Sequence, residues 1–315
     1  MPSCGAGCAF DPKKDIPSLE GKVILVTGAN AGLGKQAILD FSQHHPRQIW
    51  LGARSADKAD EAIKEIRAEV PDAPVKFLQM DLSSLESIKK AVDTFTAESD
   101  RLDILMLNAG IMGTAPGLTK EGYETQFGTN HMGHAYLTKL LMPTMMKTFK
   151  ENSGADVRVV CLSSVAHKQA PKTGIVFDSL KTDANEMGAF ERYGQSKIAN
   201  MLYARQLAKQ YPDLTVSAVH PGVVRTNLAT RMSGMPAVVR YLSPLANMFF
   251  TSVQEGAKNQ LWASVSKGVE SGEYYEPVGV KGKGTALGRD NELAEKLWEW
   301  TEKELDGYEA RGRGG

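Results

Sequence analysis

The chain has 315 residues, and 42% of them are hydrophobic, which is enough for a core that needs neither disulfides nor a structural metal. Lys and Arg together number 37, and Asp and Glu also number 37, so the net charge is zero. A nucleic-acid-binding protein would show a basic excess, because its affinity comes largely from counterion release. We therefore expect no nucleic-acid partner.

Short apolar runs alternate with amphipathic segments, a pattern typical of parallel strands that helices cover on both faces. The predicted strands are Val23–Thr27, Gln48–Ala53, Val75–Asp81, Ile104–Asn108, Val157–Ser163, Thr215–His220 and Glu273–Pro277. The predicted helices are Leu33–His44, Asp57–Val70, Leu85–Glu98, Tyr123–Phe149, Glu191–Gln210, Val253–Ser266 and Glu292–Leu305. Ser83 and Glu86 predict a capping box before the third helix. The sequence thus predicts an α/β fold with a doubly wound parallel sheet of about seven strands and helices on both faces.

Both ends of the chain lack periodicity, so residues 1–18 and 310–315 are predicted to be flexible tails around a single domain of residues 19–309. Within that domain, residues 223–252 break the alternation of strands and helices. Methionines and aromatic residues in this segment predict a mobile lid over a bulky, lipophilic substrate. An oligomer interface or a membrane-surface contact is the alternative for the same segment.

A glycine-rich turn connects the first strand to the first helix. It contains Gly28, Asn30, Gly32, Leu33 and Gly34. Glycines at such a turn permit positive φ angles and let a diphosphate approach the amides at the helix N-terminus. The spacing G-x-x-x-G-x-G departs from the common dinucleotide fingerprint, so a purely structural turn remains the alternative.

Further residues follow the third and fourth strands at the carboxyl edge, where open α/β sheets bind ligands. Asp81, with Leu82 beside it, is placed to accept a hydrogen bond from an adenine amino group or to act as a turn residue. Asn108, Ala109 and Gly110 are small enough to let a cofactor lie over the edge of the sheet, or they form an ordinary turn.

Arg54 follows the second strand, where an acidic residue would hold the ribose diol of NAD(H). A guanidinium at this point suits a 2′-phosphate through paired hydrogen bonds. The sequence therefore favours NADP(H) over NAD(H), with a solvated surface arginine as the alternative.

The candidate chemical groups lie further along the chain. Tyr193 and Lys197 are spaced i, i+4 in a predicted helix, so both side chains lie on one face, about 6 Å apart along the axis. A nearby ammonium group would lower the pKa of the tyrosine towards neutral pH. Ser163 and Ser164 end the fifth strand, where a hydroxyl is placed to polarise a carbonyl. Asn130 lies in a long apolar helix and needs a partner, for instance a helix carbonyl and a relay water.

Each of these groups also has a structural alternative. The tyrosine and lysine form a surface pair by chance in many helices, the serines also suit a helix cap, and the asparagine also suits an interhelical hydrogen bond.

Together these residues resemble the short-chain dehydrogenase/reductase family over most of the chain, from about Leu19 to Gly279. The matching motifs are Thr27–Gly34, Asp81, Asn108–Gly110, Asn130, Ser163-Ser164, Tyr193 with Lys197, and Pro221-Gly222 followed by Thr226. The flanking residues, such as Phe127–His134 and His220–Val223, look most like the retinol dehydrogenase-like and WW-domain oxidoreductase-like branch. The resemblance implies a single Rossmann-type domain.

The resemblance also implies roles for individual residues. Tyr193 would donate or accept the proton, Lys197 would lower its pKa and hold the nicotinamide ribose, and Ser164 would bond the reacting oxygen. Asn130 would support a water molecule. Val224 and Thr226 would touch the nicotinamide carboxamide.

The implied activity is an NADP(H)-dependent oxidoreductase that interconverts a carbonyl and an alcohol on a lipophilic small molecule. Reduction of an activated C=C bond and a catalytically dead nucleotide-binding regulator are the alternatives. Two features depart from the resemblance. Retinol dehydrogenases usually begin with a membrane anchor, which this sequence lacks, and Lys172–Gly188 looks like an insertion near the mouth of the site.

The remaining residues point to location and partners. Cys4, Cys8 and Cys161 offer no set of pairs, and the sequence contains neither a secretion signal nor a spanning segment, so we expect a cytoplasmic protein. His131, His134, His167 and His220 lack metal-ligand spacing, so packing or capping roles and no metal are expected. The sequence leaves a monomer and a homodimer open.

Overall fold

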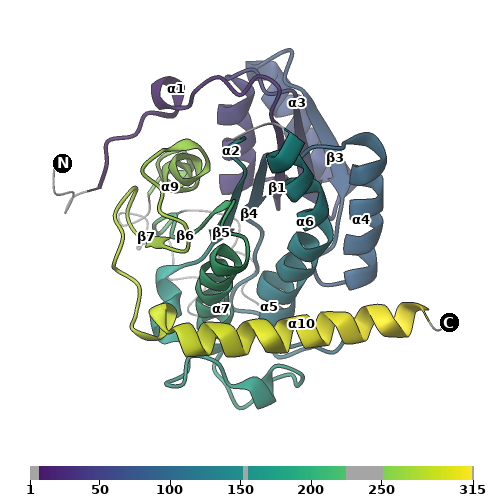
Figure 1. Ribbon diagram of the computed structural model, residues 1–315, viewed down its shortest axis with the longest axis vertical. Coiled ribbons are helices and arrows are strands. Elements are labelled where there is room, and N and C mark those ends of the chain that lie inside the picture. The colour runs from purple at the N-terminus through teal and green to yellow at the C-terminus, as the bar shows by residue number, and fades with distance from the viewer. Residues whose placement is uncertain (1–6, 152–154, 225–250, 314–315) are drawn as a thin grey trace.

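The computed structural model describes residues 7–151, 155–224 and 251–313 (Figure 1). Within them, a seven-stranded parallel sheet has the order β3-β2-β1-β4-β5-β6-β7. The strands are β1 (Val23–Thr27), β2 (Gln48–Ala53), β3 (Val75–Gln79), β4 (Ile104–Leu107), β5 (Arg158–Leu162), β6 (Thr215–Val219) and β7 (Tyr274–Tyr275). The winding reverses between β1 and β4, which confirms the predicted doubly wound fold.

Helices cover both faces of this sheet (Figure 1). They are α1 (Pro12–Asp15), α2 (Gly32–Ser42), α3 (Ala56–Glu69), α4 (Leu85–Glu98), α5 (Thr125–Phe127), α6 (Gly133–Glu151), α7 (Ala189–Gln210), α9 (Val253–Val265) and α10 (Asn291–Arg313). Successive strand residues point to opposite faces. In β1, Leu25 packs in the cluster that includes α4, α6 and α7, whereas Ile24 and Val26 pack with α2, α3 and α9. All five residues of β1 are therefore buried.

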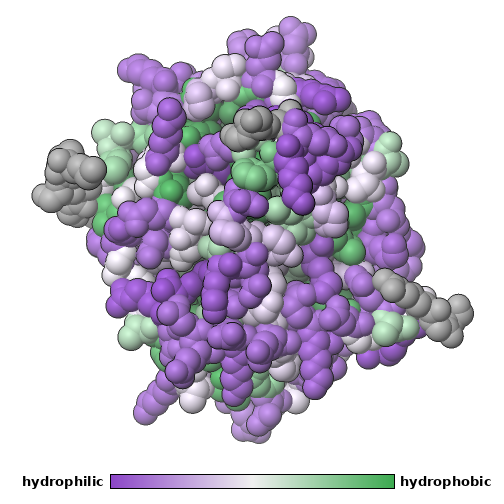
Figure 2. Space-filling model, in the orientation of Figure 1, coloured by the Kyte–Doolittle hydropathy of each residue, from purple (hydrophilic) through white to green (hydrophobic). Residues whose placement is uncertain are grey.

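The outer surface is mostly hydrophilic in the view of Figure 2, and the hydrophobic residues there form small, separate patches. Leu118 and Val223 are described residues with large apolar side chains that are more than half exposed, at 53% and 51%. Among the described helices, none is both long enough and apolar enough to cross a lipid bilayer.

The two ends of the described chain differ from the predicted tails. Phe10 and Ile16 are buried in the cluster that includes α2 and α9, and α1 lies between them in the sequence. Residues 10–16 are therefore packed against the domain through these two apolar side chains. Their spacing matches neither a helix nor a strand, so the sequence pattern did not predict this packing. At the other end, α10 continues to Arg313, so residues 310–313 are helical rather than a tail.

The predicted helix Tyr123–Phe149 consists of three parts. The short helix α5 leads into a π-helical turn at Gly128–Met132, and α6 follows directly. A π turn accommodates one extra residue and often occurs at functional sites. The apolar pattern of the sequence did not reveal it, because the π turn covers only five residues within a much longer apolar segment.

The cap of α4 lies one residue later than predicted. The Ser84 side chain accepts a hydrogen bond from the Ser87 amide at 3.3 Å, so Ser84 is the N-cap. Ser83 instead donates its hydroxyl hydrogen to the Asp81 carboxylate at 2.7 Å. Glu86 pairs with Lys90 on the exposed face of the helix, so the predicted capping box is wrong.

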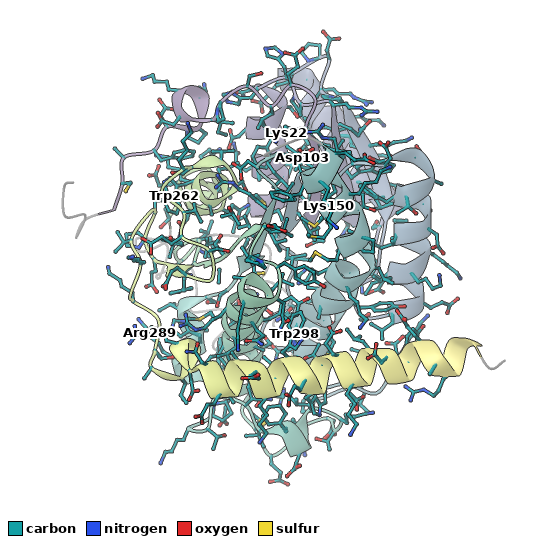
Figure 3. The ribbon with its side chains drawn as sticks, in the orientation of Figure 1. Lys22, Asp103, Lys150, Trp262, Arg289 and Trp298 are labelled. Carbon is teal, nitrogen blue, oxygen red and sulfur yellow. The ribbon has the colours of Figure 1, made fainter. Side chains whose placement is uncertain are left out.

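A buried carboxylate joins β1 and β4 at the amino-terminal edge of the sheet. The fully buried Asp103 accepts hydrogen bonds from the Val23 amide at 2.9 Å, from Lys22 at 3.1 Å and from both ends of the Arg101 guanidinium. Figure 3 shows Lys22 and Asp103 together at the end of the sheet. Each donor compensates part of the cost of burying this charge.

Asp40 in α2 provides a test of burial. Burial raises the pKa of Asp40 to about 6, despite a hydrogen bond from Gln36. Because the pKa is raised, the folded state loses stability as the pH rises through 6. Asp40→Asn should therefore increase the free energy of unfolding by about 2–3 kcal/mol at pH 8 and by about half of that at pH 5.

Denaturant unfolding at the two pH values measures this effect. The exposed Asp60 in α3 supplies the control, since Asp60→Asn should change stability little at either pH. An equal gain from Asp40→Asn at pH 5 and pH 8 would contradict the interpretation.

Candidate functional site

The carboxyl ends of the central strands open onto a cavity of about 260 Å³. It is lined by the glycine turn after β1, by residues 108–112 after β4, by Ser163 after β5, by Pro221 after β6, and by Tyr193 and Lys197 of α7. The strands β4, β5 and β6 end one residue earlier than predicted. Asn108, Ser163 and His220 therefore follow the strands, where their side chains are available for other bonds.

The glycine turn makes two close approaches within the protein. A Cβ atom at Gly28 would lie 2.8 Å from the Cα of Ala109, and one at Gly34 would lie 2.6 Å from the Nδ2 of Asn108. Gly32, with φ of 55°, begins α2. The N-cap residue Ala31 provides no side-chain hydrogen bond to the first amides of α2. This helix N-terminus at the cavity fits the phosphates of a dinucleotide.

The cavity wall after β4 is held by the fully buried Asn130. The Ile111 amide donates to the Asn130 Oδ1 at 2.8 Å, and the Asn130 Nδ2 donates to the Ile111 carbonyl at 2.9 Å. The same Nδ2 donates to the Ser196 hydroxyl at 2.9 Å. The protein partners of this amide are thus the backbone of the cavity wall and the Ser196 hydroxyl of α7, which is the interhelical bond given as the alternative, and not a helix carbonyl.

Tyr193 and Lys197 meet at the cavity as the i, i+4 spacing predicts. The Lys197 Nζ lies 5.6 Å from the centre of the Tyr193 ring and donates to the Leu162 carbonyl at 3.1 Å. Burial raises the pKa of Tyr193 to about 12, although a hydrogen bond with Ser164 opposes this shift. Burial also lowers the pKa of Lys197 to about 8. Burial thus acts against the lowering of the tyrosine pKa that the ammonium group was predicted to cause.

The two adjacent serines have different partners. Ser163 is buried and donates its hydroxyl hydrogen to the Lys197 carbonyl at 2.8 Å. Ser164 interacts with Tyr193 closely enough to oppose the rise in the tyrosine pKa, and its Oγ accepts a hydrogen bond from the Ala166 amide at 3.1 Å. Ser164 is therefore the serine whose hydroxyl is next to the tyrosine.

The residues predicted to bind the adenosine half of the cofactor are not among those that line this cavity. Arg54 is 73% exposed and lies after β2, with a guanidinium nitrogen 3.9 Å from the Asp81 carboxylate. Leu82 is buried, and a Cβ at Gly133 would lie 2.3 Å from the Leu82 carbonyl oxygen, so this residue packs against α6.

The predicted lid and nicotinamide contacts are only partly described. Val224 forms a parallel bridge with Thr251, and a Cβ at Gly256 would lie 2.3 Å from the Val224 Cγ2. Thr226 and residues 225–250, which include most of the predicted lid, lie outside the described residues.

One buried hydrogen-bond chain was missed by the sequence analysis. The Ala109 amide donates to the Thr27 Oγ1 at 3.0 Å, and this hydroxyl bonds the His134 Nε2 at 2.8 Å. The His134 Nδ1 bonds the Asn130 carbonyl at 2.9 Å. Burial lowers the pKa of His134 to about 3, so the imidazole stays neutral. The available signal was a polar pair, Thr27 and His134, within two otherwise apolar elements.

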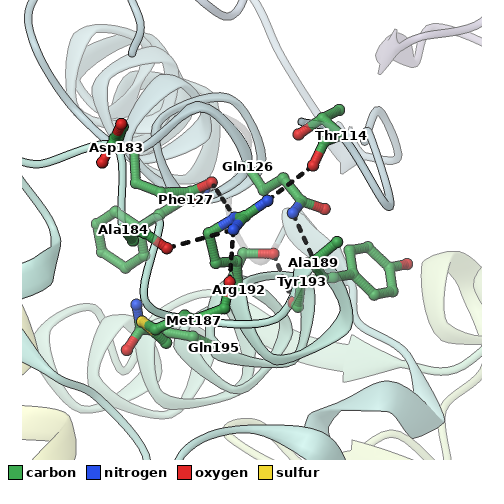
Figure 4. A network of polar contacts seen from close by, with 12 residues as sticks. Thr114, Gln126, Phe127, Asp183, Ala184, Met187, Ala189, Arg192, Tyr193 and Gln195 are labelled. Atoms are coloured by element: carbon green, nitrogen blue, oxygen red, sulfur yellow. Dashed lines mark hydrogen bonds and ion pairs between the residues drawn. The ribbon is translucent and has the colours of Figure 1, made fainter. Parts of the chain in front are cut away.

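Arg192, which precedes Tyr193, was missed as well. It is buried and forms an ion pair with the fully buried Glu124, with 3.3 Å between Nε and Oε1. Its guanidinium also donates to the carbonyls of Thr114, Ala184 and Met187, as Figure 4 shows. Thr114 lines the cavity, so this network connects the cavity wall to the start of α7. A charged residue on the buried stripe of a helix was the signal in the sequence.

Within the described part of the chain, no group of three His, Cys, Asp or Glu side chains could hold a metal ion.

Comparisons with known proteins agree with this geometry. Residues 22–236 match the family described as short chain dehydrogenase. The chain is 41% identical over 304 residues to short-chain dehydrogenase/reductase drtF of Aspergillus calidoustus, which covers 92% of this chain and 95% of that protein. It is 36% identical over 284 residues to human retinol dehydrogenase 12, covering 89% of this chain and 85% of that protein.

A solved structure from Mycobacterium paratuberculosis, described as a putative uncharacterized protein, also resembles this fold. It superposes with a TM-score of 0.72 at 26% identity and covers 93% of this chain and 97% of that one. A structure from Shigella flexneri complexed with NADP and one from Brucella melitensis complexed with NADH share the fold at TM-scores of 0.60 and 0.62, with 21% and 20% identity, and cover 82% of this chain and at least 96% of theirs.

The Arg192 network leads to a stability prediction. Arg192→Leu would leave Glu124 and three carbonyls without their buried donor, so the free energy of unfolding should fall by about 3–5 kcal/mol. The control is the exposed pair of Lys209, also on α7, and Glu295 of α10, which are 3.8 Å apart. Lys209→Leu should cost less than about 1 kcal/mol. Denaturant unfolding measures both, and similar small losses would show that the buried pair contributes little.

Proposed function

This chain belongs to the short-chain dehydrogenase/reductase family, and we propose that it interconverts a carbonyl and an alcohol on a lipophilic small molecule with NADP(H) as its cofactor. The family consists of oxidoreductases that use nicotinamide cofactors. One observation carries the proposal: Tyr193 and Lys197 meet at a cavity that the glycine turn also lines, and Ser164 lies beside the tyrosine.

The cofactor and two protein side chains have different roles in the reaction. When bound, the nicotinamide supplies or accepts the hydride. In carbonyl reduction, Tyr193 gives its hydroxyl proton to the substrate oxygen while Ser164 donates a hydrogen bond to the same atom. Tyr193 is protonated at neutral pH, as the acid of the reductive direction must be, although burial makes its proton harder to release.

Lys197 and Asn130 support this step from the interior. Positive charge from Lys197 stabilises the phenolate that forms when the proton leaves Tyr193. Asn130 fixes the wall at Ile111, against which the nicotinamide half would lie. The cavity side chains Leu33, Met112 and Leu162 are apolar, which supports a lipophilic substrate. The odd number of cysteines favours the cytoplasm as the place of action.

Arg54 supports the choice of NADP(H). Its exposed guanidinium lies after β2, where its pairing with the Asp81 carboxylate is long, at 3.9 Å. A 2′-phosphate would give this guanidinium a stronger partner for its charge. Asp81 is itself held by two hydrogen bonds from Ser83 and would remain in place for the adenine.

Substitution of the tyrosine tests the chemistry. Tyr193→Phe should lower turnover by about 10²–10⁴-fold, as expected for the loss of a general acid, and leave NADPH binding nearly unchanged. Turnover is followed by NADPH absorbance with a panel of aliphatic ketones, aromatic ketones and enones, and binding by NADPH fluorescence. Tyr211→Phe, at the C-terminal end of the same helix, is the matched control.

Near-normal turnover of the Tyr193→Phe protein would remove this residue from the mechanism. A wild-type protein that binds NADPH but reduces no member of the panel would contradict the proposed activity, and reduction of the enones alone would assign C=C chemistry.

The cofactor preference is tested separately. We expect NADPH to bind at least about tenfold more tightly than NADH, a difference of about 1.4 kcal/mol, and Arg54→Asp to reverse the order. Dissociation constants from fluorescence titration provide the measurement. Arg47→Asp at an exposed position before β2 controls for the general effect of charge. Equal affinities in the wild-type protein would refute the preference.

A further inference from the structure

Two histidines hold opposite sides of the peptide bond that follows Ser164. The His167 Nδ1 lies 2.7 Å from the Ser164 carbonyl oxygen, and the Val165 amide donates to the His220 Nδ1 at 3.3 Å. That carbonyl and that amide belong to the same peptide group. Imidazole rings therefore hold the plane of this peptide from both sides, directly after the serine that lies beside Tyr193.

The hydrogen bonds define the protonation state of each ring. The His220 Nδ1 accepts from an amide, so it carries no hydrogen. The His167 Nδ1 must donate to a carbonyl, while its Nε2 accepts from the Thr285 amide at 3.3 Å. Both rings are thus neutral, and they are opposite tautomers. A proton added to either ring would place an N–H group against an amide N–H.

The rings are presented from rigid positions. The His220 amide donates to the Tyr275 carbonyl at 3.0 Å, and the His220 carbonyl accepts from the Asn259 side chain at 2.8 Å. The ring of His167 packs edge-on against Tyr274, with 5.1 Å between the ring centres. His167 and His220 are 1% and 8% exposed, so neither ring can turn freely into solvent.

The charged groups around the pair come from three elements. Lys168 lies in the same 3₁₀ turn (Val165–Gln169) as His167, Lys197 lies in α7, and Glu276 follows β7 and accepts a hydrogen bond from the Tyr274 hydroxyl at 2.8 Å. Burial is the largest influence and lowers the pKa of both imidazoles, that of His220 to about 4. The two lysines act in the same direction, and Glu276 opposes them.

We propose that His167 and His220 are positioning residues that hold the Ser164 hydroxyl against Tyr193, and that turnover requires both rings to be neutral. The proposal rests on the proposed carbonyl chemistry at Ser164. The peptide orientation matters because the Ser164 Oγ accepts from the Ala166 amide at 3.1 Å, which directs the hydroxyl hydrogen away from the backbone. A change in the backbone angle between Ser164 and Val165 would turn this peptide away from both imidazoles and shift the Ala166 amide relative to the Ser164 hydroxyl.

Substitutions of His220 test the geometry. His220→Ala removes the acceptor for the Val165 amide and should lower kcat by about 10–100-fold, the size of effect expected from a misplaced catalytic group. His220→Asn places a side-chain oxygen near the position of Nδ1 and should recover most of the lost kcat. The KM for NADPH should stay within about twofold in both variants, because the change acts on kcat.

A pH profile distinguishes positioning from simple packing. As the pH falls, the wild-type kcat should decline when either ring gains a proton. In the double variant His167→Asn with His220→Asn, neither side chain titrates, so the acid limb should move to lower pH. The exposed His45, at the opposite edge of the sheet with a φ of 56°, provides the control. His45→Asn should leave the profile unchanged.

Two further measurements make the outcome decisive. If the rings act through Ser164, then His220→Ala should reduce kcat much less in a Ser164→Ala background than in the wild-type protein, since coupled residues are non-additive. Nitrogen NMR of the imidazoles should show His167 protonated at Nδ1 and His220 at Nε2. This measurement needs no substrate, so it tests the pair even if the proposed reaction fails.

The proposal is overturned by the opposite tautomers, by a His220→Ala protein with wild-type kcat, by additive losses in the double variant with Ser164, or by an unshifted acid limb. A protein with the expected tautomers that turns over no ketone would overturn the role in catalysis and the proposed function together.

Discussion

The paired hydrogen bonds between the Asn130 side chain and the Ile111 peptide connect three parts of the site. Ile111 belongs to the cavity wall after β4, Asn130 to the π turn before α6, and the third bond reaches Ser196, between Tyr193 and Lys197 on α7. Because this amide is fully buried, any movement of one part leaves a polar group without a partner, which is costly in an apolar interior. These bonds therefore couple the position of the cavity wall at Ile111 to the position of α7, which carries Tyr193.

Uncharged imidazoles supply much of the remaining polar structure at this edge of the sheet. His134 links Thr27 to the Asn130 carbonyl, and His167 and His220 hold the peptide after Ser164. A neutral imidazole offers one donor and one acceptor, so it can join two backbone or hydroxyl groups without bringing a net charge into the interior. Lys197 is then a buried cation 5.6 Å from the centre of the tyrosine ring, among groups that carry no net charge.

Much of the fold could be predicted because the apolar strands are buried on both faces and leave continuous runs in the sequence. The tyrosine and lysine were also brought together as predicted, because an i, i+4 spacing in a helix leaves little freedom. The π turn at Gly128–Met132 and the cap at Ser84 could not be predicted, since each depends on a single residue shift. Spacing did not reveal that burial raises the pKa of Tyr193, because burial is a tertiary property.

The carboxylate at the other edge of the sheet has a practical consequence. Asp103 directly precedes β4 and Asn108 directly follows it, so the length of β4, about 13 Å, separates the Asp103 carboxylate from the cavity. Lys22 and Arg101 bond Asp103 at this edge and do not line the cavity. An affinity tag, a surface linker or a fused partner attached to a loop at that edge would leave the entrance to the cavity open, which makes it the natural face for immobilising the protein.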